Sequence, residues 1–201
     1  MIDSTNDRTD DKHLVYNVLS GNSRSFGVII KNTERLVTQI VFKLISNPED
    51  RKDMVQDIYL KAYKKLPEFG FQSKLSTWIA QISYNTCLDY LRKKKLVLPD
   101  PGTVHEDYVA DKLDALNLQF NRITHDDSTL RRDLSGILQS EIAKLSPLYK
   151  TLITLYHNEE MSYQEIGQIT GLPEGTVKSY LFRARKALKN NLLLTYKKED
   201  L

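Results

Sequence analysis

The most informative part of the sequence lies in the last quarter of the chain, where residues that begin and end helices follow one another closely. Ser162 and Glu165 have the spacing of a capping box, in which two side chains satisfy free backbone donors at the start of a helix. Gly171 can end this short helix because glycine adopts the left-handed conformation at little cost, and Pro173 closes the turn. A second, longer helix is predicted over residues 174–189. A short helix, a tight glycine turn and a longer helix together predict a helix-turn-helix.

The predicted second helix has an apolar face and a basic face. Its inward positions are Thr176, Val177, Leu181, Ala184 and Leu188. Gly167, on the first helix, would let the two helices approach closely. The outward positions carry cations, a hydroxyl group and a phenyl ring: Lys178, Ser179, Phe182, Arg183, Arg185 and Lys186.

These outward side chains are suited to duplex DNA. Arginine and lysine bind guanine edges and phosphates, serine can bond to either, and phenylalanine can meet a thymine methyl group. Together with Thr176, they are predicted to contact DNA in the major groove and at its phosphates. The alternative is a basic surface helix that binds nothing.

Charge is distributed unevenly along the chain, although the net charge is only +3 at pH 7. Residues 92–95 are four consecutive cations, and residues 176–190 contain several cations and no acid. Residues 100–133, in contrast, are predominantly acidic. Two basic segments separated by an acidic spacer suggest a polyanion that is contacted at two places, although either segment alone could be a solvated helix face.

The rest of the sequence predicts an all-α protein of two small helical domains. Glycine and proline are few, and no window shows convincing strand alternation. Residues 98–102 contain two prolines and a glycine, which cannot continue a helix. We predict domains over residues 13–97 and 134–196, the second containing the helix-turn-helix. An acidic flexible linker, residues 98–133, joins them, with a transient helix at residues 113–123.

Three helices are expected in the first domain. An apolar stripe predicts a helix over residues 34–46, which Asn47-Pro48 ends. The stripe resumes over residues 50–66. Ser76 or Thr77 is expected to cap the next helix, which leads into the cationic run.

Several functional classes are disfavoured. Cys87 is the only cysteine, so no intrachain disulfide can form, and this suits a reducing cytoplasm. Residues 1–12 lack the apolar core of a secretory signal, and no stretch is long and apolar enough for membrane insertion. The histidines are scattered, without metal-ligand spacing: His13, His105, His125 and His157. We expect no enzyme activity, no metal and no cofactor.

At this point the chain resembles the bacterial RNA polymerase sigma factors of the extracytoplasmic-function (ECF, group 4) subfamily, and the resemblance covers both domains. Residues 145–156 (LSPLYKTLITLY), 161–167 (MSYQEIG) and 175–188 (GTVKSYLFRARKAL) are similar to the C-terminal region of that family. Residues 53–63 (DMVQDIYLKAY) resemble its segment that docks on the clamp helices of the polymerase β′ subunit. Asp53, Gln56 and Asp57 lie at i, i+3 and i+4, and this polar edge is expected to bind core polymerase, although an ordinary solvated helix face has the same pattern.

Residues 75–92 (LSTWIAQISYNTCLDYLR) are similar to the helix that opens the −10 element in this family. The resemblance implies roles in binding the −10 element for Gln81, Asn85, Asp89 and Arg92. A pocket for an unstacked base is expected at Asn85 and in the preceding loop, residues 68–76. Residues 67–72 (PEFGFQ) lack the cation that many relatives carry there. Trp78 is expected to be a core anchor, and Asp89 could simply pair with Arg92 or Lys93.

The resemblance implies a cytoplasmic promoter-specificity subunit that grips the −35 element and melts the −10 element. Its partners would be the polymerase core, through the β′ clamp helices and the β flap, promoter DNA and an anti-sigma factor. The linker is too short for the middle domain of the larger housekeeping sigma factors, which points to the ECF group. The alternative is a stand-alone helix-turn-helix regulator that binds a palindrome as a dimer without polymerase.

Overall fold

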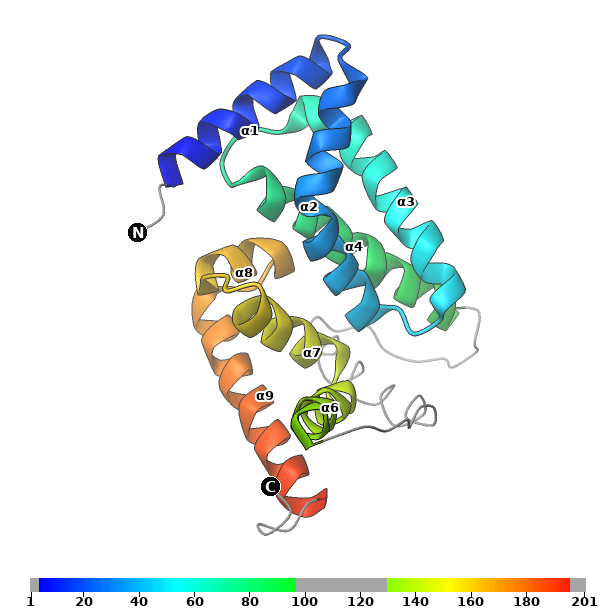
Figure 1. Ribbon diagram of the computed structural model, residues 1–201, viewed down its shortest axis with the longest axis vertical. Coiled ribbons are helices and arrows are strands. Elements are labelled where there is room, and N and C mark those ends of the chain that lie inside the picture. The colour runs from blue at the N-terminus through cyan, green and yellow to red at the C-terminus, as the bar shows by residue number, and fades with distance from the viewer. Residues whose placement is uncertain (1–3, 97–129, 196–201) are drawn as a thin grey trace. The chain divides into compact units, whose positions relative to one another are not determined.

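The computed structural model describes residues 4–96 and 130–195, and every regular element in those ranges is a helix (Figure 1). The fold is therefore all-α, as predicted. The chain divides into two compact units. The helices of residues 4–96 are described first, as the N-terminal unit, and those of residues 130–195 second, as the C-terminal unit. The transient helix expected at residues 113–123 lies outside the described residues. Within the described ranges, no helix is both long enough and apolar enough to cross a membrane.

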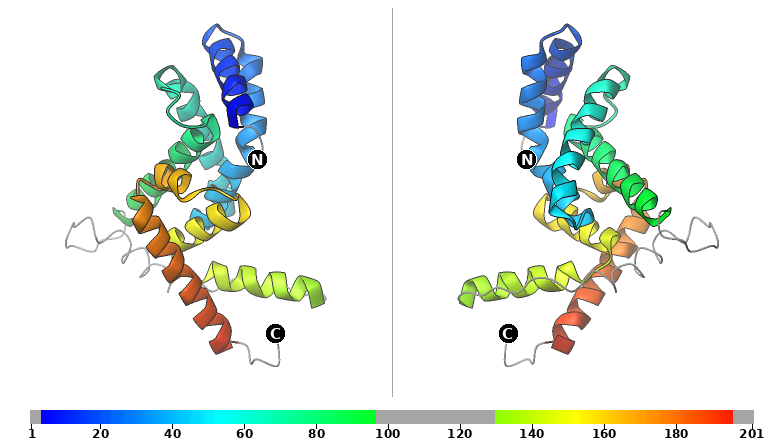
Figure 2. Two further views of the ribbon diagram at one scale, coloured as in Figure 1. Left: turned by 90° about the vertical axis from the view of Figure 1, so that its left-hand side faces the viewer. Right: turned by 90° about the vertical axis from the view of Figure 1, so that its right-hand side faces the viewer.

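The N-terminal helices pack around α2. The elements are α1 (Ser4–Leu19), α2 (Ser23–Leu44), α3 (Pro48–Lys65), the short 3-10 turn η1 (Leu66–Glu68) and α4 (Leu75–Leu96). Helix α2 packs against α1, α3 and α4, and α3 also packs against α4 (Figures 1 and 2). The largest fully buried apolar side chains of this core are Ile29, Ile40, Ile45, Ile58, Leu66 and Ile79.

The break at Asn47-Pro48 lies where the sequence predicts it. Asn47 caps α3, its side chain accepting a hydrogen bond from the backbone N–H of Glu49 at 3.1 Å. Pro48 occupies the first turn, where its missing N–H costs nothing. Local capping chemistry therefore fixes the start of α3.

Two parts of the N-terminal unit differ from the sequence expectation. Helix α1 begins well before residue 13, where the first domain was expected to start. The sequence did not predict this helix because it is mostly polar and buries few apolar residues, among them Val15 and Val18. Helix α2 begins at Ser23 rather than near residue 34, with Asn22 as its cap. Its first turns bury Ser25 and Thr33 beside Ile29, which interrupts the apolar pattern.

The start of α4 is capped by another helix and not by its own hydroxyl side chains. The carboxylate of Asp11, on α1, accepts a hydrogen bond from the backbone N–H of Leu75 at 2.9 Å. The expected cap at Ser76 or Thr77 is wrong, since α4 already includes both residues and the buried Thr77 hydroxyl has no hydrogen-bond partner. A contact between residues far apart in the chain has replaced the local cap.

The C-terminal unit consists of α6 (Leu130–Ala143), α7 (Pro147–Ile153), the π-helical turn η2 (Thr154–Asn158), α8 (Tyr163–Thr170) and α9 (Glu174–Thr195). Helix α7 packs along α9, and α6 lies across α9 (Figure 2). Helix α6 begins at Leu130, so the last residues of the expected linker are helical. Helix α9 begins where predicted and continues past Lys189 to Thr195.

The predicted capping box and turn are present. The backbone N–H of Glu165 donates to the Ser162 hydroxyl at 3.2 Å, and the backbone N–H of Ser162 donates to the Glu165 carboxylate at 2.9 Å. Gly171 has a φ of +74°, as a left-handed helix end requires. A Cβ added at Gly167 would lie 2.8 Å from the carbonyl oxygen of Leu172, so the close approach is to the turn and not to α9.

Candidate nucleic-acid interface

Helix α9 presents its basic face to solvent. Val177, Leu181 and Ala184 are buried, while Thr176 and Leu188 are half-buried. The side chains predicted to meet DNA are exposed: Lys178, Ser179, Phe182, Arg183, Arg185 and Lys186. Phe182 is 67% exposed, so its ring is accessible to a partner surface. The structure thus gathers the predicted residues on one accessible face, with Thr176 at its edge.

Lys178 and Arg183 have partners within α9, and Lys178 also has one on α8. Lys178 forms an ion pair with Glu174 at 2.8 Å, and its ammonium group lies 5.3 Å from the ring centroid of Tyr163. The guanidinium group of Arg183 lies 5.8 Å from the ring centroid of Tyr180.

Arg185 is held by the residues that precede α8. Its guanidinium group lies 5.0 Å from the ring centroid of Tyr156, and its Nε donates to His157 Nε2 at 3.3 Å. Burial and the charge of Arg185 lower the pKa of His157, which favours the neutral ring that can accept this hydrogen bond. The roles of Tyr156, Tyr163 and His157 were not predictable from the sequence, because their proximity to α9 depends on the tertiary fold.

The residues expected to bind the −10 element lie along α4. Asn85, Asp89 and Arg92 are exposed and Gln81 is half-buried, with the spacing of one helix face. Asp89 and Arg92 form an ion pair at 3.2 Å, as the sequence allowed. Both charges remain largely accessible to solvent.

The loop before α4 is built around an aromatic cluster. Phe69 is buried, and its ring lies 4.8 Å from that of Phe71 and 5.1 Å from that of Trp78, centroid to centroid. Trp78 packs against the buried Phe69 but is itself only half-buried, so it lies at the edge of the core that the sequence predicted for it. Phe71 has a φ of +56°, a conformation that costs a phenylalanine about 1–3 kcal/mol. The cluster therefore gives this loop a defined shape beside the start of α4.

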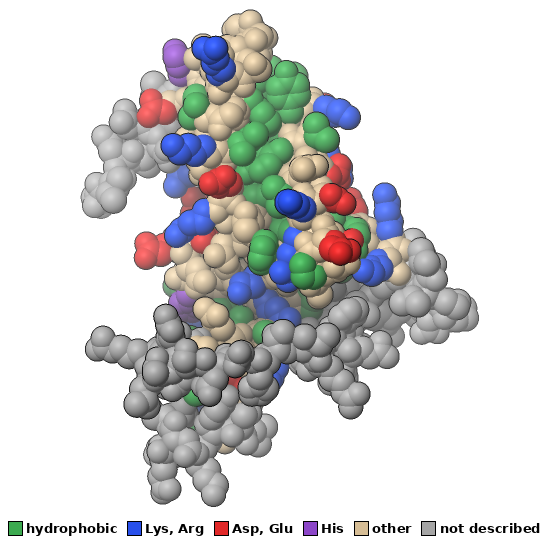
Figure 3. All heavy atoms as spheres, turned by 45° about the vertical axis from the view of Figure 1, so that its right-hand side comes forward, with side chains coloured by type: hydrophobic (Ala, Val, Ile, Leu, Met, Phe, Trp, Pro, Cys, Tyr) green, Lys and Arg blue, Asp and Glu red, His purple; other side chains and the backbone are tan. Residues whose placement is uncertain are grey.

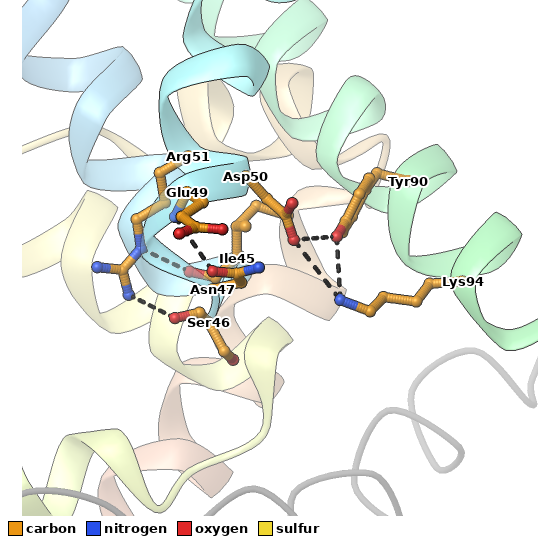
Figure 4. A network of polar contacts seen from close by, with 8 residues as sticks. All are labelled: Ile45, Ser46, Asn47, Glu49, Asp50, Arg51, Tyr90 and Lys94. Atoms are coloured by element: carbon orange, nitrogen blue, oxygen red, sulfur yellow. Dashed lines mark hydrogen bonds and ion pairs between the residues drawn. The ribbon is translucent and has the colours of Figure 1, made fainter.

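The end of α4 is fastened to the start of α3 (Figure 4). The hydroxyl group of Tyr90 donates to the carboxylate of Asp50, and Lys94 lies 3.1 Å from the Tyr90 hydroxyl and 3.6 Å from Asp50. The hydrogen bond from Tyr90 lowers the pKa of Asp50 and so keeps it charged. Arg51 is also fixed, since its Nε donates to the Ile45 carbonyl at 2.8 Å. The basic run at the end of α4 is thus partly neutralised within the chain.

The polar edge of α3 is exposed, as its spacing predicts. Asp53, Gln56 and Asp57 all face solvent, and Asp57 forms an ion pair with Lys61 at 2.8 Å. Leu60, which is 59% exposed, continues the same helix face and is not among the residues predicted to bind core polymerase. Its register could have revealed it, because Leu60 follows Asp53 and Asp57 at i+7 and i+3, whereas the buried Ile58 and Ala62 define another face.

Apolar side chains also gather in a band on the surface of the N-terminal unit (Figure 3). The large apolar side chains exposed on α1–α3 are Tyr16, Leu19, Val28, Phe42, Leu60 and Tyr63. An acidic edge with exposed leucine and tyrosine beside it is a surface suited to a protein partner.

No cluster of three or more His, Cys, Asp or Glu side chains with metal-binding geometry occurs in the described ranges. Cys87 is buried and free, and burial raises the pKa of its thiol to about 12, so it is not a reactive nucleophile.

Both units of the chain match known protein families. Residues 29–97 match the family described as Sigma-70 region 2, and residues 135–188 match Sigma-70, region 4. The chain is 30% identical over 189 residues to the ECF RNA polymerase sigma factor SigW of Bacillus subtilis, covering 90% of this chain and 96% of that protein. It is also 30% identical over 182 residues to the ECF RNA polymerase sigma-E factor of Haemophilus influenzae, covering 90% of this chain and 95% of that protein.

Two solved structures share the fold. CnrH, in complex with the cytosolic domain of CnrY, matches with a TM-score of 0.64 and 22% identity, covering 93% of this chain and 99% of that chain. The sigma factor RpoE of Bartonella quintana, in complex with the anti-sigma factor NepR, matches with a TM-score of 0.59 and 21% identity, covering 86% of this chain and 99% of that chain.

Proposed function

The chain belongs to the ECF RNA polymerase sigma factors, which direct RNA polymerase to promoters, and we propose that its two helical units divide promoter recognition between them. The unit containing α9 grips the −35 element as duplex DNA. The unit containing α4 binds the −10 element and holds it open.

The exposed basic face of α9 carries the first half of this proposal. A capped helix and a glycine turn place a helix with one buried face and one cationic face on the surface of the unit. This is the geometry of a recognition helix in the major groove. Arg183 and Lys186 are assigned to guanine edges or phosphates, Ser179 to either, and Phe182 to an apolar contact. Thr176, Lys178 and Arg185 are assigned to phosphates beside the groove.

The −10 element is assigned to the face of α4 that begins with Gln81. Asn85 offers an amide donor and an amide acceptor on the exposed face of α4, which is suitable for reading the edge of an unstacked base. Asp89 and Arg92 extend this surface toward the cationic end of the helix.

The acidic edge of α3 is assigned to the core polymerase. Asp53, Gln56 and Asp57 would meet cations on the β′ clamp helices, and Leu60 adds an apolar contact at the same face. We assign the C-terminal unit to the β flap and the apolar band of the N-terminal unit to an anti-sigma factor. The chain acts in the cytoplasm, where the polymerase is, and contributes no catalytic group of its own.

The test combines transcription with one assay of promoter binding and one assay of strand opening. Core RNA polymerase and the full chain would be incubated with genomic fragments from the source organism, and run-off transcripts would identify a promoter. Arg183→Ala is expected to weaken holoenzyme binding to that promoter about 5- to 150-fold, the range for loss of a bidentate base contact. Lys31→Ala, which removes an exposed cation on α2, is the matched control and should bind as the wild type does.

Asn85→Ala is expected to spare the duplex complex and reduce permanganate reactivity of unpaired thymines in the −10 element. Asn32→Ala, at an exposed asparagine on α2, is its control. Normal transcription by both Arg183→Ala and Asn85→Ala would contradict these assignments. Tight, polymerase-independent binding of the chain to a palindrome as a dimer would instead favour a stand-alone regulator.

A further inference from the structure

Two of the cations assigned to DNA phosphates are not free to move as isolated surface side chains. Arg185 lies over the ring of Tyr156 at 5.0 Å, and Lys178 lies over the ring of Tyr163 at 5.3 Å, each measured to the ring centroid. Tyr156 belongs to η2 and Tyr163 is the first residue of α8, so neither tyrosine is part of the recognition helix.

The two tyrosines are stacked on each other. Their ring centroids are 5.1 Å apart with an interplanar angle of 7°, and the Tyr163 hydroxyl donates to the Tyr156 hydroxyl at 3.4 Å. This hydrogen bond lowers the pKa of Tyr156 and raises that of Tyr163, as expected for an acceptor and a donor. Arg185, Tyr156, Tyr163 and Lys178 therefore form a continuous row of a cation, two stacked rings and a second cation, which we term the tyrosine-cation row.

The row has an anchor at each end. Arg185 also donates to His157 Nε2, and Lys178 also pairs with Glu174. Both tyrosine side chains are half-buried, so the rings are held by the fold while the cationic groups remain accessible. A long cationic side chain loses considerable rotamer freedom when it binds a ligand, and a side chain that is ordered beforehand loses less.

We propose that Tyr156 and Tyr163 are positioning residues that hold Arg185 and Lys178 in the orientation in which these cations bind DNA phosphates. This inference rests on the proposed function, since it assigns the approach of the duplex to the face of α9. It adds that η2 and α8, which carry the two tyrosines, influence the affinity of the basic face of α9 for DNA without contacting bases.

The experiment uses holoenzyme, formed from core RNA polymerase and the full chain, and a duplex that carries the upstream part of a promoter identified by run-off transcription. Affinity would be measured by fluorescence anisotropy over a series of salt concentrations. Tyr156→Leu and Tyr163→Leu are each expected to weaken binding about two- to fivefold, the loss of one exposed cation–π contact. Tyr156→Phe and Tyr163→Phe keep the ring and should bind within about twofold of the wild type. Circular dichroism would establish that each variant is folded.

A double-mutant cycle separates positioning from general support of the fold. If Tyr156 acts through Arg185, Tyr156→Leu should have no further effect in a chain that already carries Arg185→Ala. The same absence of effect is expected for Tyr163→Leu in a Lys178→Ala background. The proposal would be overturned if each leucine substitution weakened binding equally in the wild type and in the corresponding alanine background. It would also be overturned if neither leucine variant weakened binding.

Arg183→Ala, measured on the same duplex, distinguishes failure of the positioning role from failure of the proposed −35 function. If Arg183→Ala weakens binding and the leucine variants do not, the DNA assignment of α9 stands and the positioning role is wrong. If Arg183→Ala binds like the wild type, the proposed −35 function itself fails and the positioning role with it.

Discussion

Two buried threonines of the N-terminal unit have opposite hydrogen-bonding environments. Thr33, on α2, is 3% exposed, and its hydroxyl lies 2.8 Å from the Ile29 carbonyl and 3.0 Å from the Tyr59 hydroxyl. Thr77, on α4, is 1% exposed, and its hydroxyl has no partner. Because a buried hydroxyl without a partner loses its hydration and gains nothing in return, the two residues should differ in what they contribute to stability.

Replacement of each threonine by valine tests this difference. Thr77→Val is expected to raise the free energy of unfolding by about 1 kcal/mol, since it removes an unsatisfied polar atom. Thr33→Val should lower it by about 1–2 kcal/mol, because it leaves Tyr59 without one partner. Trp78 is the only tryptophan, so its fluorescence during urea denaturation reports the N-terminal unit. Loss of stability in both variants would contradict the argument.

At the scale of elements, the turn between α8 and α9 depends on the absence of a side chain at Gly167. A Cβ there would approach the backbone oxygen of Leu172 to 2.8 Å, and backbone cannot move aside as a flexible side chain can. Gly175, in the first turn of α9, is a useful contrast because a Cβ there would meet nothing within 4 Å. The path of the turn after α8 therefore depends on Gly167 and not on Gly175.

Gly167→Ala is expected to destabilise the helix-turn-helix by about 1–3 kcal/mol through overpacking. Gly175→Ala, the matched control, should be neutral or stabilising by up to about 1 kcal/mol, because alanine loses less backbone entropy in a helix. Amide hydrogen exchange in α8 and α9 would measure both effects. Unchanged protection in Gly167→Ala would show that the turn can relax to admit a methyl group.

The elements that sequence predicts well are those with local signals at their ends. Asn47-Pro48 marked the start of α3, and Ser162 with Glu165 marked the start of α8, because caps and turns involve residues close in sequence. Helix α1 and the Asp11 cap of α4 were not predictable, since they depend on contacts between residues far apart in the chain.

The same distinction between local signals and long-range contacts applies to the residues of the candidate site. Helical periodicity was enough to predict that Lys178, Arg183 and Arg185 face solvent. It could not predict that Tyr156 and Tyr163 lie beneath two of these cations, because that arrangement requires η2 and α8 to fold back on α9. Sequence thus located the surface, and the tertiary fold determines how ordered its side chains are.

At the scale of the whole molecule, charge is distributed in a way that the net value of +3 conceals. Cations are concentrated at the end of α4 and on α9, and acidic residues in the segment between the two units. Negative charge on the same chain opposes indiscriminate attraction to a polyanion. The acidic segment should therefore limit binding to DNA that lacks a promoter.

Neutralising that segment tests this idea. A full chain with Asp100→Asn, Asp107→Asn, Asp111→Asn and Asp114→Asn is expected to bind a random-sequence duplex more tightly than the wild type at low salt. The difference should shrink as salt increases, because exposed charges are screened. A chain with Asn117→Ser, Gln119→Ser, Asn121→Ser and Thr124→Ser is the uncharged control. Equal affinities of all three chains in electrophoretic mobility shifts would exclude this electrostatic effect.

The bond between Asp11 and Leu75 has a practical consequence for dissecting the molecule. The part of the chain that matches Sigma-70 region 2 starts at residue 29, inside α2, so a recombinant fragment cut at that boundary would lose all of α1. The Leu75 N–H would then lose its acceptor at the start of the helix assigned to strand opening. Weak melting by such a fragment would reflect where it was cut, and a fragment for biochemical work should retain α1 from Ser4 onward.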